Sequence, residues 1–230
     1  MERMNFAGLT SHVLEESDSD GPVVVLMHGF GALGDDLVPL GDALLELPNR
    51  PRIVCPEAPL SVEGGPARAW WMLDMEVFER RARGERIDRS QELPPNLPTV
   101  RAQVGELLRE VAAYFQVQPS RLVLGGFSQG SMVACDVALH AAEKPGALLL
   151  LSSTLIAEPV WRPLAPTLHG VPVFQSHGHL DPLLPFEDAE RLSALLRAGG
   201  ADLSFVEFRG GHEIPRPALL GLAKTIAQLG

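Results

Sequence analysis

The sequence predicts an α/β protein built on a doubly wound, mostly parallel sheet with helices on both faces. Unbroken apolar runs, such as PVVVLM at residues 22–27, are typical of strands buried on both faces of a parallel sheet. Apolar residues at helical spacing follow these runs, most clearly from Val100 to Phe115. Strands that alternate with helices along a chain favour parallel pairing, because each helix crosses back over the sheet.

The expected elements follow one another from residue 22 to the end of the chain. The first strand leads into the glycine-containing loop HGFG at 28–31, and then into a helix over 35–47 that Pro48 stops. Further strands are expected at 52–55, 121–126, 147–151, 171–175 and 203–208, and further helices at 100–115, 131–142, 187–197 and 215–229. Residues 61–98, named here the excursion, interrupt this alternation with a Gly-Gly-Pro turn, two tryptophans and an arginine-rich stretch. A loop of this length predicts a lid or a substrate-binding segment.

Length, composition and charge limit the classes of function. A chain of 230 residues with 46% hydrophobic and 21% charged residues fits one globular domain over 1–230 and excludes intrinsic disorder. The formal charge of -10 disfavours nucleic acid and anionic membrane surfaces as partners. No apolar run reaches the roughly 20 residues of a membrane span, and the N-terminus lacks the features of a secretory signal. We therefore expect a cytoplasmic protein, monomeric or homodimeric, with Cys55 and Cys135 reduced and buried.

The most specific motif is GFSQG at residues 126–130, between a predicted buried strand and a helix. In this context G-x-S-x-G predicts a nucleophile elbow, a tight turn that exposes a reactive serine. The serine of such a turn has a strained backbone, so the glycines two residues before and after it leave room for neighbouring chain. Ser128 is therefore the candidate nucleophile, and the simpler alternative is that Ser128 only caps the helix.

A serine nucleophile requires a base and an acid that orients the base. His212 lies in the loop GGHE after the last predicted strand, and Asp181 follows the strand at 171–175, at the sheet edge where open α/β proteins place their sites. The order Ser128, Asp181, His212 is the order of the α/β-hydrolase arrangement. The backbone N–H groups of Phe30 and Gln129 are the candidate oxyanion donors, and we expect a structural hydrogen-bonding role for His28.

Several separated motifs together resemble one family. These are LMHGFG at 26–31, RAWW at 68–71, GFSQG at 126–130, HGHLDP at 177–182 and GHEI at 211–214. The chain resembles the serine carboxylesterase and lysophospholipase family, which includes the acyl-protein thioesterases and belongs to the α/β-hydrolase superfamily. This resemblance implies an α/β-hydrolase fold and cofactor-free hydrolysis of carboxylic esters or thioesters, with a small-molecule ester or thioester as substrate. It also implies that Trp70 and Trp71 lie near the substrate, whereas the residues alone equally allow two aromatics that close the core.

Two other functions compete with an acyl-transferring serine hydrolase. The pattern His177, His179, Asp181 is compatible with three metal ligands on one side of an extended segment, and so with a metal-dependent hydrolase. His179 also stands where the family often has an acidic residue. A second alternative is a non-catalytic module that binds a small ligand on the same fold. The complete set of Ser128, Asp181 and His212 favours catalysis through an acyl-enzyme, with no metal and no cofactor.

Overall fold

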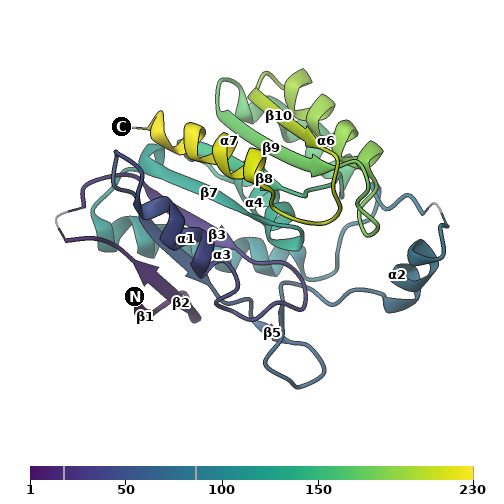
Figure 1. Cartoon of the computed structure of the whole chain (residues 1–230), viewed down its shortest axis with the longest axis horizontal. Coiled ribbons are helices and arrows are strands. Elements are labelled where there is room, and N and C mark those ends of the chain that lie inside the picture. The colour runs from purple at the N-terminus through teal and green to yellow at the C-terminus, as the bar shows by residue number, and fades with distance from the viewer. Residues whose placement is uncertain (18, 86, 230) are drawn as a thin grey trace.

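The centre of the structure is a twisted sheet of eight strands (Figure 1). The computed structural model describes residues 1–17, 19–85 and 87–229. In spatial order the strands are β1 (Glu2–Phe6), β2 (Leu9–Leu14), β4 (Arg52–Pro56), β3 (Val23–Met27), β7 (Leu122–Phe127), β8 (Ala147–Leu151), β9 (Pro172–Gly178) and β10 (Asp202–Phe208). The strands from β4 to β10 pair in parallel, whereas β1 and β2 join the edge antiparallel. The predicted parallel sheet is confirmed.

The two N-terminal strands are absent from the sequence-based prediction. They form a hairpin around Ala7 and Gly8, which both have positive φ, of 51° and 78°. β1 is largely exposed and mixes charged with apolar residues, so it contains no apolar run that would reveal a strand. β2 pairs with β4 at the sheet edge, and its apolar side chains are buried in the cores on the two faces, so its burial depends on tertiary contacts.

Helices cover both faces of the sheet, as predicted. On one face lie α1 (Val38–Leu45) and α7 (Arg216–Ala227), packed on side chains such as Val24, Val123 and Phe174. The other face holds α3 (Leu97–Phe115), α4 (Gln129–His140), α5 (Glu158–Leu164) and α6 (Phe186–Ala198). Two short 3-10 helices, η1 (Pro119–Arg121) and η2 (Ala165–Leu168), complete the framework. Alternate strand residues supply the two cores, because side chains along a strand point to opposite faces.

Most predicted elements agree with the structure within a few residues, and the differences have local causes. The helix expected from residue 131 begins at Gln129, directly after the serine. α5 was not predicted, because it is short and contains Pro159 and Pro163. Its one fully buried side chain, Trp161, packs in the core beneath α4.

The excursion runs outside the sheet and returns to it at the start of α3 (Figure 1). It contains a small hairpin, β5 (Leu60–Ser61) with β6 (Arg68–Ala69), and the short helix α2 (Met75–Ala82). α2 lies away from the sheet, at the right of Figure 1. Its exposed residues Glu76, Glu79 and Arg80 fit a solvated, mixed-charge segment.

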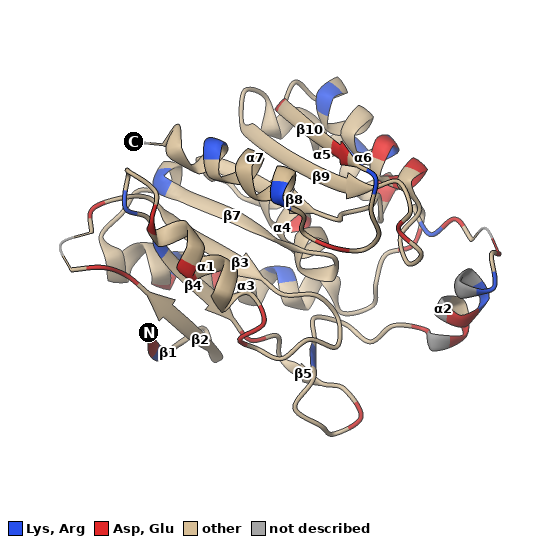
Figure 2. Cartoon of the chain, in the orientation of Figure 1, with Lys and Arg blue, Asp and Glu red and all other residues tan. Residues whose placement is uncertain are grey.

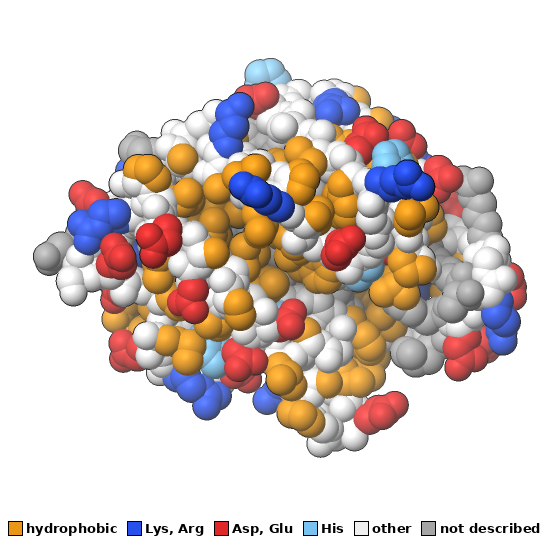
Figure 3. Space-filling view, in the orientation of Figure 1, with side chains coloured by type: hydrophobic (Ala, Val, Ile, Leu, Met, Phe, Trp, Pro, Cys, Tyr) orange, Lys and Arg blue, Asp and Glu red, His pale blue; other side chains and the backbone are white. Residues whose placement is uncertain are grey.

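Charged residues of both signs are spread over the helices and loops, while the central strands carry almost none (Figure 2). On the face in Figure 3, Lys and Arg side chains stand singly among acidic and apolar ones and form no basic patch. Among the described helices, none is both long enough and apolar enough to cross a membrane. Both cysteines are free and buried, and burial raises the pKa of the Cys55 thiol to about 12.

Candidate active site

A cavity of about 360 Å³ opens at the carboxyl ends of the central parallel strands. Its walls come from the loop after β3, the start of α4, the loop after β8, the loop after β9, the excursion and the loop after β10. Ser128 and His212 both line it. Most of the other lining side chains are apolar, as is usual for a small-molecule site.

Ser128 sits on a sharp turn between β7 and α4. Its φ of 52° and ψ of -119° lie in a region that side-chain-bearing residues rarely occupy. The turn is held on both sides, because the amide of Ser128 donates to the carbonyl of Leu151 at 2.9 Å and its carbonyl accepts from the hydroxyl of Ser131 at 2.6 Å. The strained turn predicted from the motif is therefore present.

The glycines of the motif are required by close backbone contacts. A Cβ at Gly126 would lie 2.4 Å from the carbonyl oxygen of Met27, and a Cβ at Gly130 would lie 2.0 Å from the same atom. Both distances are far inside van der Waals contact. The end of β3 thus passes directly over the turn, and only glycine at these two positions allows it.

His212 and Asp181 form a hydrogen-bonded pair at the same sheet edge. Nδ1 of His212 lies 2.6 Å from Oδ2 of Asp181, and the Asp181 side chain is fully buried. An ionised carboxylate can only accept, so Nδ1 donates and Nε2 is left free to take a proton. In the part of the chain that the structure describes, Nε2 has no hydrogen-bond partner. Ser128 and His212 share the cavity without a hydrogen bond between them, as is common before substrate binds.

Glycine also brings the two loops of this pair together. A Cβ at Gly178 would lie 2.4 Å from the carbonyl oxygens of Gly210 and Gly211. The loops are joined there by hydrogen bonds from the amide of His179 to Phe208 and from the amide of Leu180 to Gly210, both 2.9 Å. The glycines of HG at 177–178 and GG at 210–211 could therefore have been used to predict from the sequence that these two loops lie in close contact.

The surroundings of Asp181 keep it ionised. Burial alone would raise its pKa, but the hydrogen bond and charge of His212 and the amides of Leu183 and Leu184 outweigh burial. Both amides donate to Oδ1 at 2.9 Å. The pKa of Asp181 is therefore lowered, which suits an acid that must orient an imidazole and stabilise its charge.

His177 was predicted only as a possible metal ligand, and the structure gives it another position. It is fully buried, its Nε2 donates to the carbonyl of Leu184 at 2.9 Å, and Nε2 lies 3.4 Å from Oδ2 of Asp181. Burial lowers the pKa of His177 and keeps the ring neutral. His179 instead pairs with Glu207 at 3.3 Å on the surface. Among the described residues no three His, Cys, Asp or Glu side chains converge as metal ligands, so the geometry does not support the metal alternative.

The loop after β3 lies against the serine. A Cβ at Gly29 would be 3.4 Å from Cβ of Ser128, and Phe30 lines the cavity. The amide of Gln129 is the first of α4, and first-turn amides have no acceptor within their own helix. In the described chain the amide of Phe30 also lacks a backbone acceptor. Both predicted donors thus belong to segments beside the serine, and neither has an acceptor among the described residues.

His28 and the excursion hold the loop after β3 in place. The amide of Ala58 donates to Nε2 of His28 at 3.0 Å, so Nδ1 carries the proton and donates to the carbonyl of Gly29 at 2.8 Å. Burial lowers the pKa of His28, which keeps this tautomer neutral. The backbone of Arg68 pairs with Gly31 and Ala32 at 2.8 Å. The expected structural role of His28 is confirmed.

The two tryptophans occupy different environments. Trp71 lines the cavity, whereas Trp70 is fully buried, does not line it, and donates from Nε1 to the carbonyl of His28 at 2.9 Å. The side chain of Gln129 joins them to α4, because Oε1 accepts from the amide of Trp70 and Nε2 donates to the carbonyl of Trp71. Trp70 therefore supports the loop after β3 from outside the cavity. Of the two tryptophans, Trp71 is the one that can contact a ligand.

Comparison with known proteins gives a consistent family. The profile of the Phospholipase/Carboxylesterase family matches residues 10–229. The putative hydrolase MhqD of Bacillus subtilis is 27% identical over 213 residues, which are 88% of this chain and 90% of that protein. Acyl-protein thioesterase 1 of Gibberella zeae is 27% identical over 209 residues, 82% of each chain.

Solved structures agree with the sequence relatives. The esterase PE8 superposes with a TM-score of 0.84 and 26% identity, covering 96% of this chain and 99% of its own. The carboxylesterase of Bacillus cereus superposes with a TM-score of 0.73 over 96% and 95% of the two chains, and its 17% identity speaks to the fold alone. The α/β-hydrolase fold implied by the sequence motifs is confirmed.

Proposed function

This chain belongs to the Phospholipase/Carboxylesterase family of α/β hydrolases, and we propose that it hydrolyses carboxylic esters or thioesters through Ser128, His212 and Asp181. The observation that carries the proposal is the 2.6 Å hydrogen bond between His212 and Asp181 beside a cavity that Ser128 also lines. A serine nucleophile, a histidine base and an acid that orients this base are thereby available in the required chain order. A cavity of about 360 Å³ suits a small to medium acyl group.

In the first half-reaction, Nε2 of His212 takes the proton of Ser128 as Oγ attacks the acyl carbonyl carbon. The amides of Phe30 and Gln129 donate to the oxygen that becomes negative. His212, now protonated and stabilised by Asp181, gives its proton to the departing alcohol or thiol. The acyl group is then bonded to Ser128.

In the second half-reaction a water molecule replaces the alcohol or thiol. His212 takes one proton from the water as its oxygen attacks the acyl carbon, and returns that proton to Oγ of Ser128 as the acid departs. The same two amides stabilise the second oxyanion, each contributing about 3 kcal/mol to lowering the barrier. No group outside the chain, substrate and water takes part in these steps.

The test is hydrolysis of p-nitrophenyl esters from acetate to laurate, with a matched thioester series. Ser128→Ala should lower kcat/KM by about 10³-fold or more. Ser204→Ala, an exposed serine on β10, is the matched control and should keep the parent rate. A chelator should have no effect.

Each contrary result has a distinct meaning. Full activity of Ser128→Ala would overturn the assignment of the nucleophile. Loss of activity on chelation would restore the metal-dependent alternative. A parent protein that hydrolyses none of the esters or thioesters would favour the non-catalytic ligand-binding module.

A further inference from the structure

The excursion contributes a charged wall to an otherwise largely apolar cavity. Arg89 and Glu92 line the cavity from the excursion, and Asp188 lines it from α6. Arg89 is the only Lys or Arg among the described lining residues. The chemistry proposed above uses none of these three side chains, so their presence beside the serine requires another explanation.

Arg89 has unused hydrogen-bonding capacity. Its Nε donates to Oε2 of Glu92 at 2.7 Å, and its side chain is only 25% exposed. Within the described residues, Nη1 and Nη2 of Arg89 make no hydrogen bond and no ion pair. A guanidinium offers five donors in a rigid fork, so the outer edge of a largely buried arginine is here left to bind something other than protein.

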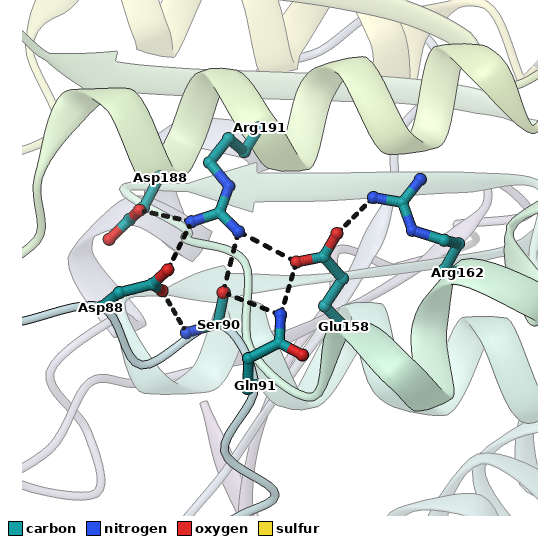
Figure 4. Close-up of polar contacts among 7 residues, drawn as sticks. All are labelled: Asp88, Ser90, Gln91, Glu158, Arg162, Asp188 and Arg191. Atoms are coloured by element: carbon teal, nitrogen blue, oxygen red, sulfur yellow. Dashed lines mark hydrogen bonds and ion pairs between the residues drawn. The ribbon is translucent and has the colours of Figure 1, made fainter.

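The residues on either side of Arg89 are fixed by a polar clasp (Figure 4). We define the clasp as Asp88, Ser90, Gln91, Glu158, Arg162, Asp188 and Arg191. Arg191, on α6, donates to Oδ2 of Asp88 at 3.1 Å and to the hydroxyl of the buried Ser90 at 2.9 Å. It also donates to Glu158 of α5 at 2.9 Å. Arg89 therefore lies between two anchored neighbours, which limits the orientations available to its side chain.

Backbone contacts place this anchored segment beside the apolar wall. The carbonyl of Ser90 accepts from the amide of Glu158 at 2.7 Å, and the carbonyl of Glu92 accepts from the amide of Ala157 at 3.0 Å. The adjoining residues Leu155 and Ile156 line the cavity. An acyl chain that runs along this apolar wall would therefore come up against Arg89.

The charges around the cavity decide which group Arg89 can receive. Glu92 already pairs with Arg89, and the carboxylate of Asp36 lines the same cavity, whereas Asp188 is paired with Arg191. The formal charge of the whole chain is -10. A second carboxylate near Arg89 would be repelled by these acids, whereas a neutral oxygen accepts a hydrogen bond without adding charge.

We propose that Arg89 is a specificity-determining residue, and that Nη1 and Nη2 donate to a neutral oxygen in the substrate's acyl chain. The substrate class is then an ester or thioester of an oxygenated acyl group, such as a keto or hydroxy acid. An unsubstituted alkyl chain leaves the donors of Arg89 unpaired, which costs binding free energy. This inference rests on the proposed ester or thioester hydrolysis.

The test compares three p-nitrophenyl esters of similar length, hexanoate, 5-oxohexanoate and hydrogen adipate, each corrected for its rate of hydrolysis by hydroxide. In the parent protein kcat/KM should be about tenfold higher for 5-oxohexanoate than for hexanoate, and lowest for adipate. Arg89→Met should remove the preference for the keto ester, and Arg89→Lys should restore part of it. Glu92→Gln should raise the rate for adipate, because one repelling charge is gone.

Arg216→Met, an exposed arginine on α7, is the matched control and should keep the parent preference. An unchanged ratio of keto to alkyl ester in Arg89→Met would overturn the inference while leaving Ser128-dependent hydrolysis intact. A parent preference for adipate over both other esters would overturn the choice of a neutral group. Failure of every ester and of the matched thioesters in the parent protein would overturn the proposed function and this inference together.

Discussion

The turn that carries Ser128 and the segment that carries Arg89 line one cavity, but they are held by different kinds of contact. The turn at 126–130 is locked by backbone packed on backbone, with Gly130 so close to Met27 that no side chain fits. The segment at 88–92 is held by two backbone hydrogen bonds to residues 157–158 and by side-chain contacts of Asp88 and Ser90 with Arg191, which is 39% exposed. Steric exclusion is insensitive to solvent, whereas partly exposed ion pairs are screened by it.

The same contrast separates the residues proposed to catalyse the reaction from those proposed to select the substrate. The loops after β3, β7, β9 and β10 present the candidate catalytic groups from the rigid sheet edge. The excursion presents Arg89 and Glu92 from outside the sheet. Changes at the sheet edge should therefore abolish activity or folding, whereas changes in the clasp should alter which substrates are accepted.

The largest effect is expected at the acid of the sheet edge. Asp181→Asn should lower kcat/KM by about 10⁴-fold, because the amide no longer holds the correct tautomer of His212 or stabilises its charge. The measurement is ester hydrolysis at pH 7.5. Asp202→Asn, an exposed aspartate at the start of β10, is the control. Near-parent activity of Asp181→Asn would show that His212 does not depend on this acid.

Two glycine substitutions distinguish a position where no side chain fits from one where a side chain has room. Gly130→Ala should lower the free energy of unfolding by more than ~3 kcal/mol, because its Cβ would lie 2.0 Å from a backbone oxygen. Gly105→Ala, in the middle of α3 with nothing within 4 Å of its Cβ, should instead raise stability by about 0.5–1 kcal/mol. Urea unfolding measures both. If Gly130→Ala lowered the free energy of unfolding no more than Gly105→Ala does, the steric account of the turn would be contradicted.

The clasp should respond weakly in stability and clearly in selectivity. Arg191→Met should cost only about 1 kcal/mol of unfolding free energy, since the ion pairs it loses are partly exposed. It should reduce the preference for the keto ester, because Asp88 and Ser90 lose their anchor. High salt should reduce the same preference in the parent protein and have less effect in the variant. If high salt reduced the preference equally in Arg191→Met, the salt effect would arise outside the clasp.

The smallest expected effect is the loss of unfolding free energy as the pH falls. Burial lowers the pKa of His28 and of His177, so the folded protein keeps both rings neutral while the unfolded chain protonates them below about 6.5. Their contribution to stability is complete above that pH and is lost as pH falls toward the lowered folded values. The slope is at most about 1.4 kcal/mol per pH unit for each histidine.

This acid sensitivity belongs to the sheet edge and not to the clasp. His177→Gln should reduce the loss of unfolding free energy between pH 7.5 and 5.5, measured by urea unfolding at each pH. His169→Gln, an exposed histidine before β9, should leave that loss unchanged. The lowered pKa of Asp181 adds a further loss only in stronger acid, below its ordinary value of about 3.9. Identical pH dependence in parent and His177→Gln would contradict this assignment.

Much of the sheet edge was predictable because its constraints are written as residue types at fixed spacing. A strained turn under a passing strand needs glycine on both sides of the serine, and both glycines are found in that contact. Asp181 and His212 were predicted to meet from the ends of their strands, and they do. The separate environments of Trp70 and Trp71 were not predictable, because neighbouring tryptophans look alike until the sheet and the excursion enclose one of them.

The sequence by itself determined the alternation of strands and helices, the strained turn at Ser128 and the chain order of Ser128, Asp181 and His212. Local sterics and hydrophobic periodicity govern these features, and both act over a few residues. Only the tertiary structure decided the pairing of β2 with β4, the separate environments of Trp70 and Trp71, and the anchoring of the neighbours of Arg89 by Arg191. These depend on contacts between residues up to 103 positions apart in the chain, and no local pattern specifies which partners meet.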